Sequence, residues 1–351
     1  MVQSAVNQHP KTRVSELAAN KRVRLVDQYG RVHRSMRLSV IDKCQLRCSY
    51  CMPAEGLPWL AKADLLTVEE ILRIASVAYD AGFTEFRITG GEPLIRADVP
   101  ELVGALKSLE TAERPLDLSL TTNAVLLPKY AEALKNAGLT RVNVSLDTLR
   151  PDRFKALTHR DEFARVMAGI QAAKEVGLAP IKLNTLLIPG VNDDEVLDLA
   201  DFAISNGYQL RFIEQMPLGD GPWNSSKIIT ERDILSTLES KYDLAPVPGR
   251  GSAPAARWYV NGGPESIGII SSVTKPFCGD CDRLRLTADG QLRTCLFSDK
   301  ETDLRGPLRA GATNLDLLDL MGMATWAKEA GHLIGKAGFT VPKRNMSRIG
   351  G

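Results

Sequence analysis

The sequence predicts an α/β fold: an open, partial (β/α)6 barrel of the TIM type, followed by a smaller C-terminal α+β domain. Apolar strand-like segments alternate with amphipathic helix-like segments from residue 36 to residue 214, which is typical of right-handed βαβ units in a parallel sheet. Six such strands are found, whereas a closed barrel of this type has eight. The alternation stops near residue 217, where Pro and Gly become frequent.

The barrel is expected to follow an N-terminal extension, residues 1–35, which is polar and basic and contains a hairpin around 27–30. The first strand is expected at 36–40. Thr67 and Glu70 form a capping-box pattern that begins a helix to about residue 81, and the next strand is expected at 85–89. The later helices are expected at 98–109, 128–137, 161–176 and 193–206, and the later strands at 116–121, 141–146, 181–188 and 209–214.

The domain boundary is placed near 217, so that the barrel spans 36–216 and the C-terminal domain spans 217–351. A turn-rich link is expected at 217–223, and a loop at 244–264, where Pro, Gly and Ala dominate. The expected regular elements of this domain are helices at about 230–240 and 314–334 and short strands at 266–272, 283–287 and 291–296. The tail, 341–351, shows no periodicity and ends in two glycines.

The composition is that of an ordinary globular protein, with 44% hydrophobic and 25% charged residues. A net charge of +2 gives no reason to expect a nucleic-acid partner. No apolar run approaches the roughly 18 residues that would span a bilayer, and the basic N-terminus lacks the apolar core of a signal peptide. We therefore expect a cytoplasmic protein without a membrane partner, whose six cysteines are thiols or metal ligands rather than disulfides.

Three of the cysteines crowd into one short loop directly after the first predicted strand. They are Cys44, Cys48 and Cys51, called the first triad below. Thiolates are soft ligands that favour zinc or iron–sulfur clusters, and a closed zinc site needs four ligands. Three thiolates on a cubane cluster would leave one iron open to a small molecule. A zinc knuckle completed by a distant His, or three unrelated buried cysteines, are the alternatives.

The other three cysteines form a second triad: Cys278, Cys281 and Cys295. Strand periodicity places Arg283 and Arg285 on the same face as Cys281. A three-residue hairpin loop at 288–290 would pair Arg285 with Arg293. A zinc ribbon is the alternative here, but the sequence after Cys295 offers it no fourth ligand. The pattern favours a second cluster with an open iron, beside arginines suited to an anion.

Cations occur in four of the predicted parallel strands, although such strands are usually apolar because both faces are buried. These cations are Arg37, Arg87, Lys182 and Arg211. They could face outward or pair with Glu85, Asp147 and Glu214. Alternatively, four cations from one barrel could line a pocket for an anionic ligand such as a polyphosphate.

With these residues in view, almost the whole chain resembles the family of GTP cyclases that begin molybdenum-cofactor biosynthesis, which are radical S-adenosylmethionine (radical SAM) enzymes. The three-cysteine loop alone would indicate only the radical SAM superfamily and its kind of barrel. The second triad together with the terminal Gly-Gly indicates this family. The matching stretches are 37–51, 87–94, 120–123, 142–147, 211–214, 278–297 and 350–351.

The resemblance implies a role for each matching residue. The first triad would bind the [4Fe-4S] cluster that cleaves SAM, and the second would hold an auxiliary [4Fe-4S] cluster whose open iron meets the guanine of GTP. The SAM pocket would be lined by Tyr50, Gly91, Ser145 and Met216. The GTP contacts would be Arg37, Arg87, Thr121, Lys182, Arg211, Arg283 and Arg285. The residues closest to the reaction would be Arg283, Arg285, Gly350 and Gly351. The two glycines belong to this set because the tail would reach into the active site.

The implied reaction is that of a lyase that uses a 5′-deoxyadenosyl radical to convert GTP to (8S)-3′,8-cyclo-7,8-dihydroguanosine 5′-triphosphate. The implied partners are a flavodoxin or ferredoxin as electron donor, the downstream cyclic pyranopterin monophosphate synthase, and a second copy of the chain in a homodimer. Two other functions are open: a different radical SAM enzyme with an auxiliary cluster, such as a peptide modifier, and a zinc-binding interaction module.

Two positions depart from the family pattern. Ala124 and His159 stand where the family usually has Gly. Neither is expected to bear chemistry, but Ala124 could tighten the loop that it occupies.

Overall fold

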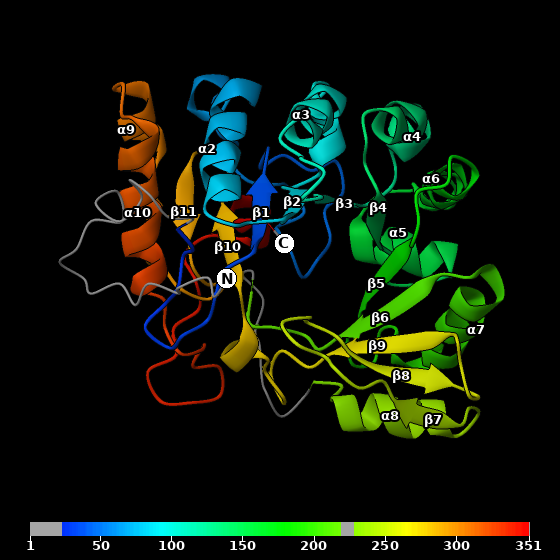
Figure 1. The fold of residues 1–351 in the computed structure, drawn as a ribbon. Helices are drawn as coiled ribbons and strands as arrows, with labels where there is room; N and C mark the ends of the chain where they lie inside the picture. Colours follow the sequence, from blue (N-terminus) through cyan, green and yellow to red (C-terminus); the bar gives the residue numbers. More distant parts are fainter. Residues whose placement is uncertain (1–22, 219–227, 351) are drawn as a thin grey trace.

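The computed structural model describes residues 23–218 and 228–350 (Figure 1). The predicted barrel is confirmed: six strands pair in chain order, each parallel to the next. Their bounds are β1 Ser35–Ser39, β2 Glu85–Thr89, β3 Asp117–Thr122, β4 Arg141–Ser145, β5 Lys182–Leu186 and β6 Gln209–Ile213.

The C-terminal part of the chain extends this sheet at both edges. β10 (Arg283–Leu286) pairs in parallel with β1, and β9 (Ser266–Ile270) pairs in parallel with β6. Antiparallel strands complete the described sheet of twelve strands, in the order β12-β11-β10-β1-β2-β3-β4-β5-β6-β9-β8-β7. They are β7 Leu244–Pro246, β8 Ala256–Val260, β11 Gln291–Arg293 and β12 Thr302–Asp303. The barrel stays open, because the described outer strands β12 and β7 do not pair with each other.

Helices cover the outer side of the sheet, where α2, α3, α4 and α6 lie side by side in chain order (Figure 1). The capping box is confirmed: Thr67 accepts from the backbone of Glu70, and the Glu70 carboxylate accepts from the Thr67 backbone. The barrel helices are α2 Val68–Asp80, α3 Val99–Lys107, α4 Leu127–Asn136, α5 Pro151–Thr158, α6 Phe163–Glu175 and α7 Val196–Asn206. The C-terminal helices are α8 Glu231–Glu239, α9 Arg305–Arg309, α10 Asn314–Trp326 and α11 Met346–Ile349.

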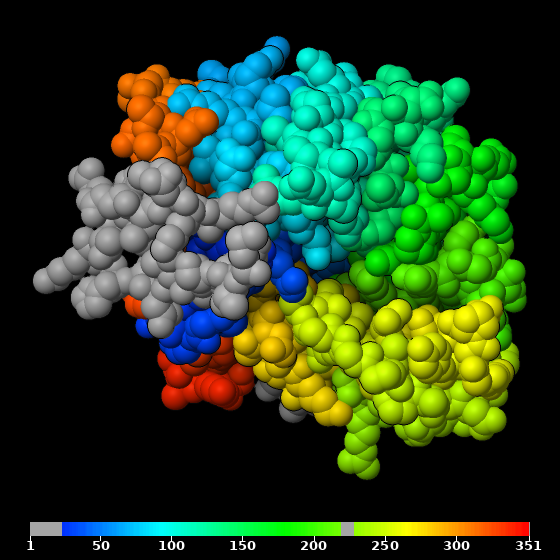
Figure 2. Space-filling view, viewed as in Figure 1, coloured from blue at the N-terminus to red at the C-terminus, as the bar shows by residue number. Residues whose placement is uncertain are grey.

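The C-terminal helices close against the start of the barrel. Figure 2 shows the orange C-terminal region beside the blue region that contains α2, and α10 contacts α2. Arg309 donates to the Glu70 carboxylate at 2.7 and 3.0 Å, and Arg73 donates to Asn314 at 3.0 Å. One hydrophobic cluster runs through both parts of the chain, from Met36 in β1 to Met321 in α10.

Several elements differ from the prediction. α5, β12 and α9 were not expected, and the predicted loop at 244–264 contains β7 and β8. The predicted helix at 314–334 ends at Trp326, because the chain turns there to bring Lys328 against the second triad. The tail, expected to be irregular, contains the single turn α11.

The expected hairpin around 27–30 is present as the Val26–Val32 bridge. The rest of the predicted N-terminal extension up to residue 22, most of the predicted link at 217–223, and Gly351 lie outside the described residues. Among the described helices, none combines the length and the apolar character that crossing a membrane requires.

Candidate active site

A cavity of about 350 Å³ opens at the carboxyl ends of the parallel strands, and both triads line it. In α/β sheets, ligands bind at this end of the strands. Each barrel strand contributes residues to the lining: Arg37 from β1, Arg87 and Thr89 from β2, Thr121 and Thr122 from β3, Ser145 from β4, Asn184 and Leu186 from β5, and Arg211 and Ile213 from β6.

The loop of the first triad is held by the chain that follows β2. The backbone N–H groups of Gly91 and Glu92 donate to the carbonyls of Ile41 and Lys43, both at 2.7 Å. A Cβ atom on Gly91 would overlap the carbonyl oxygen of Lys43, so only glycine permits this approach. A Cβ atom on the preceding Gly90 would likewise overlap the carbonyl oxygen of Ile41, so both glycines are needed to hold the start of the cysteine loop.

A buried carboxyl group lies behind the first triad. Glu92 is fully buried and accepts from Thr122 Oγ1 at 2.8 Å and from the Asn123 backbone at 2.7 Å. Asn123 in turn donates to Cys44 Sγ at 3.7 Å. Burial, with a further effect of the nearby Glu92 carboxylate, raises the pKa of Cys44 to about 12.

The second triad lies among cations. Cys281 follows the short turn Cys278–Asp280, and β10 and β11 pair Arg285 with Arg293, as predicted. Lys328 Nζ lies 3.5 Å from Cys281 Sγ. Burial acts to raise the pKa of Cys281, but the positive charges of Lys328 and Arg283 lower it below its ordinary value.

The six cysteines fit two iron–sulfur clusters. All are free, half-buried and exposed to the same cavity. No three of the described His, Cys, Asp and Glu side chains converge on a single metal ion. In a four-iron cluster each thiolate binds a different iron, so the ligands need not converge on one point.

Six of the cations that line the cavity and the space beside it, all predicted from the sequence, have no ion pair to any described residue: Arg37, Arg87, Lys182, Arg211, Arg283 and Arg285. The carboxylates that could have paired with these cations form other hydrogen bonds. Asp147 accepts from Tyr50 Oη at 2.6 Å. Glu214 accepts from backbone N–H groups of residues 231, 273 and 274.

The cations repel one another in a largely dry site. Burial, followed by the charges of Arg285 and Arg87, holds the pKa of Arg37 well below its usual range. Burial and the nearby Arg211 lower the pKa of Lys182 to about 7. Since guanidinium groups stay charged in proteins, this repulsion is a cost that a bound anion would relieve.

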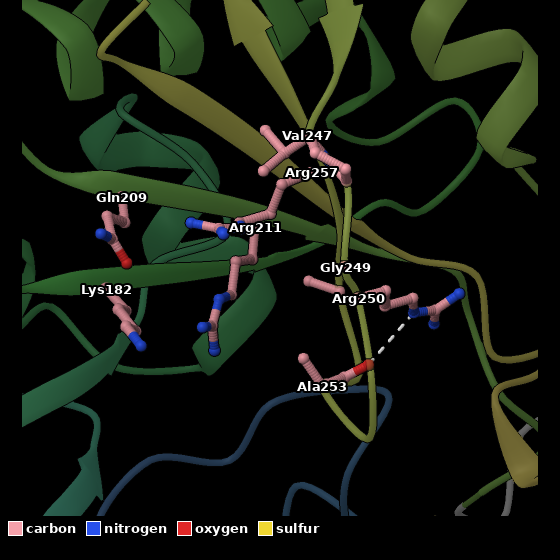
Figure 3. A pocket seen from close by; sticks show the side chains of 10 residues that line it. Lys182, Gln209, Arg211, Val247, Gly249, Arg250, Ala253 and Arg257 are labelled. Carbon is pink, nitrogen blue, oxygen red and sulfur yellow. Dashed lines mark hydrogen bonds between the residues drawn. The ribbon is translucent and has the colours of Figure 1, made fainter. Parts of the chain in front are cut away.

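A side pocket of about 190 Å³ opens next to the main cavity, and Arg211 lines both. Figure 3 shows Lys182, Arg211 and Arg257 projecting from the sheet and Arg250 from the loop before β8. Arg250 Nε donates to the Ala253 carbonyl at 3.1 Å, which holds this loop in a compact turn. The pocket is therefore cationic on more than one side.

The tail enters the same end of the sheet. Arg285 Nη1 donates to the carbonyl of Gly350. A Cβ atom on Gly350 would lie 2.9 Å from Ser39 Cβ and 3.0 Å from Thr89 Cγ2, which are the last residues of β1 and β2. Gly350 is buried there, whereas its neighbour Gly351 is outside the described residues.

The structure brings almost all of the predicted site residues to one place. The main cavity is lined by both triads and by Tyr50, Gly91, Ser145, Met216, Arg37, Arg87, Thr121, Arg211, Arg283 and Arg285. Lys182 lines the side pocket instead. Sequence reasoning missed Gln215 and His332 in the main cavity, and Arg250 and Arg257 in the side pocket.

Both departures from the family pattern have a left-handed backbone. The φ angle is +65° at Ala124 and +53° at His159, a region that favours glycine. Ala124 also packs tightly, because a Cβ atom on Gly169 would overlap its carbonyl oxygen. The usual glycines are thus explained by backbone conformation.

Comparisons with known proteins agree with this arrangement. Residues 38–203 match the radical SAM superfamily, and residues 208–334 match the family described as Molybdenum Cofactor Synthesis C. The GTP 3′,8-cyclase of Streptomyces coelicolor is 52% identical over 331 residues, which cover 93% of this chain and 96% of the relative. That of Corynebacterium glutamicum is 48% identical over 336 residues, covering 93% and 89% of the two chains.

The fold has relatives among solved structures. Streptococcus suis SuiB bound to the precursor peptide SuiA superimposes with a TM-score of 0.57 at 15% identity, over 92% of this chain and 78% of that chain. Such a distant likeness concerns the fold alone. The sequence matches are far closer and span both parts of the chain. The chain therefore belongs to the GTP 3′,8-cyclase family of the radical SAM superfamily.

Proposed function

We propose that the protein is a radical SAM lyase that converts GTP to (8S)-3′,8-cyclo-7,8-dihydroguanosine 5′-triphosphate, the first step of molybdenum-cofactor biosynthesis. The observation that carries the proposal is the shared cavity, which is lined by both triads and by cations from β1, β2, β6 and β10. A distant fold likeness to SuiB gives no comparable reason to favour a peptide substrate.

The first triad would hold the cluster that binds SAM, and the second would hold the auxiliary cluster. When bound, these groups supply one-electron reduction and the 5′-deoxyadenosyl radical. Gly91 lines the cavity beside the first triad without a side chain in the way of SAM, while its N–H group holds the cysteine loop. Ser145 and Met216 line the same part of the barrel, and Tyr50 is held by its bond to Asp147.

GTP would lie between the two triads, with its phosphates among the cations. Charge-assisted bonds from guanidinium groups are the strong ones for phosphate. Arg37, Arg87 and Arg211 approach from the barrel, and Arg283 approaches from β10. Thr121 Oγ1 is buried without a hydrogen-bond partner, so it is available to a ligand. Lys182 would reach the phosphate end through the side pocket.

Arg285 and the terminal glycines would act at the purine end. Arg285 is held by the Gly350 carbonyl beside the second triad. A cation fixed in a dry site stabilises negative charge that develops during a reaction. The tail also packs against the last residues of β1 and β2, where it would help to exclude water from a radical reaction.

The proposal extends to the surroundings of the enzyme. We assign the barrel to 36–216 and the auxiliary-cluster domain to 217–351. A flavodoxin or ferredoxin would donate electrons, and cyclic pyranopterin monophosphate synthase would take the product. The enzyme would work in the cytoplasm as a homodimer.

The test is anaerobic purification and cluster reconstitution, followed by iron and sulfide assays and incubation with SAM, dithionite and GTP. We expect about eight irons per chain, 5′-deoxyadenosine formation, and the cyclised triphosphate by mass spectrometry. ATP in place of GTP is the matched control and should give no cyclised product. About four irons, or SAM cleavage that GTP does not convert into cyclised nucleotide, would refute the proposal.

A further inference from the structure

The N-terminal hairpin has a rigid, buried centre. Asp27 is completely buried, and its Oδ2 accepts from Arg31 Nε at 2.6 Å and lies 3.1 Å from His33 Nε2. Its Oδ1 accepts from the backbone N–H groups of Tyr29 and Arg31 at 2.9 and 3.1 Å. One carboxylate therefore sets the hairpin turn and fixes the guanidinium of Arg31 in one orientation.

That guanidinium joins the hairpin to the second triad. Arg31 Nη1 donates to the carbonyls of Cys278 at 2.6 Å and of Ala330 at 3.0 Å, and Nη2 donates to the Glu329 carbonyl at 2.7 Å. The next residue, Gly331, lies against the same cysteine: a Cβ atom on Gly331 would be 2.8 Å from Cys278 Cβ. Three segments distant in sequence thus meet at one cysteine ligand.

Lys328 completes the arrangement. It is only 3% exposed, and its Nζ donates to the carbonyls of Cys281 at 3.1 Å and Arg283 at 2.8 Å and to Cys281 Sγ at 3.5 Å. Three acceptors match the three N–H bonds of an ammonium group. Gln28 Nε2 donates to the Lys328 carbonyl at 3.2 Å, which ties the lysine to the hairpin.

The lysine has no carboxylate counter-ion in the described ranges, so the negative group that it faces is the Cys281 thiolate. A buried charge is stable only when it is paired. Hydrogen bonds to the cysteine sulfurs and nearby charge are among the features that set the potential of an iron–sulfur cluster.

We propose that Asp27, Arg31 and Lys328 form a clamp that positions the second triad and raises the reduction potential of the cluster held there. The inference rests on the proposed function, since it takes the second triad as a cluster site. Reduction adds one electron and no proton, so the reduced cluster carries one more negative charge. A fixed cation beside Cys281 stabilises that state more than the oxidised one. These three are positioning residues.

The test replaces the cation while keeping the side-chain length. Lys328→Met is combined with Cys48→Ala, so that the full chain retains only the second cluster, and the cluster is titrated with dithionite and followed by electron paramagnetic resonance. The midpoint potential should move to a more negative value than in Cys48→Ala alone. Lys328→Arg should restore it, and Lys155→Met, an exposed lysine in α5, should leave it unchanged.

An unchanged potential in Lys328→Met would overturn the inference. If Lys328→Met loses the cluster, Lys328→Arg decides: recovery of the iron supports the clamp, and failure to recover it overturns the clamp. In the chain with intact cysteines, the loss should be about half of the iron; loss of all iron would indicate general misfolding and refute a local role.

Arg31→Met separates position from charge, because Lys328 stays in place. It should lower the iron bound at the second triad, while the fraction that binds keeps the parent potential. Full iron content in Arg31→Met would overturn the positioning part of the clamp. The proposed function is tested separately, by formation of cyclised product with the unaltered chain. A failed clamp experiment therefore cannot be mistaken for a failed cyclase assay.

Discussion

The two triads share a cavity but lie in opposite electrostatic surroundings. The first lies near Glu92, and burial together with that carboxylate raises the pKa of Cys44 to about 12. At the second, the charges of Lys328 and Arg283 outweigh the effect of burial and lower the pKa of Cys281. The first triad depends on its metal to stabilise thiolates, whereas the protein itself supplies positive charge at Cys281; burial still raises the pKa of Cys295.

They also differ in how the chain builds them. The first triad lies within one loop, supported by the ends of the neighbouring strands β2 and β3. The second is supported by residues 27–31 and 328–331, both far away in sequence. The cysteines of both triads can be recognised from their spacing, but the distant residues that support the second triad cannot.

The largest effects should come from single cysteine ligands. Cys48→Ala should remove about half of the iron and abolish both 5′-deoxyadenosine formation and cyclisation. Cys281→Ala should remove a similar share and abolish cyclisation, but it should retain some SAM cleavage. Iron assays and chromatography of both products measure this. Equal loss of SAM cleavage in the two variants would contradict the assignment of SAM cleavage to the first triad alone.

The carboxylate behind the first triad should make the stability of the protein depend on pH. Burial raises the pKa of Glu92 from 4.5 to about 7, against three hydrogen bonds that favour the charged form. Between these values the folded chain binds the proton more tightly than the unfolded chain, so stability should fall as pH rises from 4.5 to 7. Anaerobic thermal midpoints across this range measure the slope.

Glu92→Gln should remove that part of the pH dependence. It should also cost about 1–3 kcal/mol at neutral pH, because the amide cannot accept all three bonds. Glu132→Gln, an exposed change in α4, is the control and should leave the slope unaltered. An unchanged slope in Glu92→Gln would mean that Glu92 does not titrate in this range.

The cations near the second triad are continued by the cations of the side pocket. Their role in binding phosphate can be tested with a substitution in the side pocket, which contains no cysteine. Arg257→Ala should raise KM for GTP about tenfold, the loss expected for one partly exposed charge-assisted bond to phosphate. SAM cleavage in the absence of GTP should be unchanged. Arg165→Ala, an exposed arginine in α6, is the control. An unaltered KM would confine phosphate binding to the main cavity.

Much of the fold follows from local patterns. The six barrel strands and the capping box at Thr67 were predictable, because periodicity and helix-start signals act over a few residues. Cys44 and Arg37 could be placed in one site because the carboxyl ends of parallel strands meet at one edge. The Arg285–Arg293 register followed from the length of the hairpin loop.

The missed features have two different causes. β8 carried a signal, since Asn261-Gly262 stands between two apolar runs and typically marks a hairpin, but the Pro-rich segment before it obscured the pattern. Arg257 was missed with it. Lys328 carried no signal: its helical pattern continues beyond residue 326, and only contacts with residues 28 and 281 show why the helix ends.

The smallest expected effect concerns the loop behind the first triad. Ala124→Gly removes a side chain from a left-handed backbone, where φ is +65°, and relieves strain of roughly 1 kcal/mol. Part of this gain is offset by the greater freedom of glycine in the unfolded chain, so stability should rise by less than about 1 kcal/mol. Asn261→Gly changes another left-handed residue, at φ +49° in the exposed turn that follows β8, and serves as the control.

The comparison of these two variants isolates the role of the loop. Ala124 adjoins Asn123, which donates to Cys44 Sγ, so Ala124→Gly should also change the rate at which the first triad loses iron to a chelator. Asn261→Gly should leave that rate as it is, and neither variant should alter iron loss from the second triad. Equal chelation rates in Ala124→Gly and the parent chain would show that the loop strain is not transmitted to the first triad.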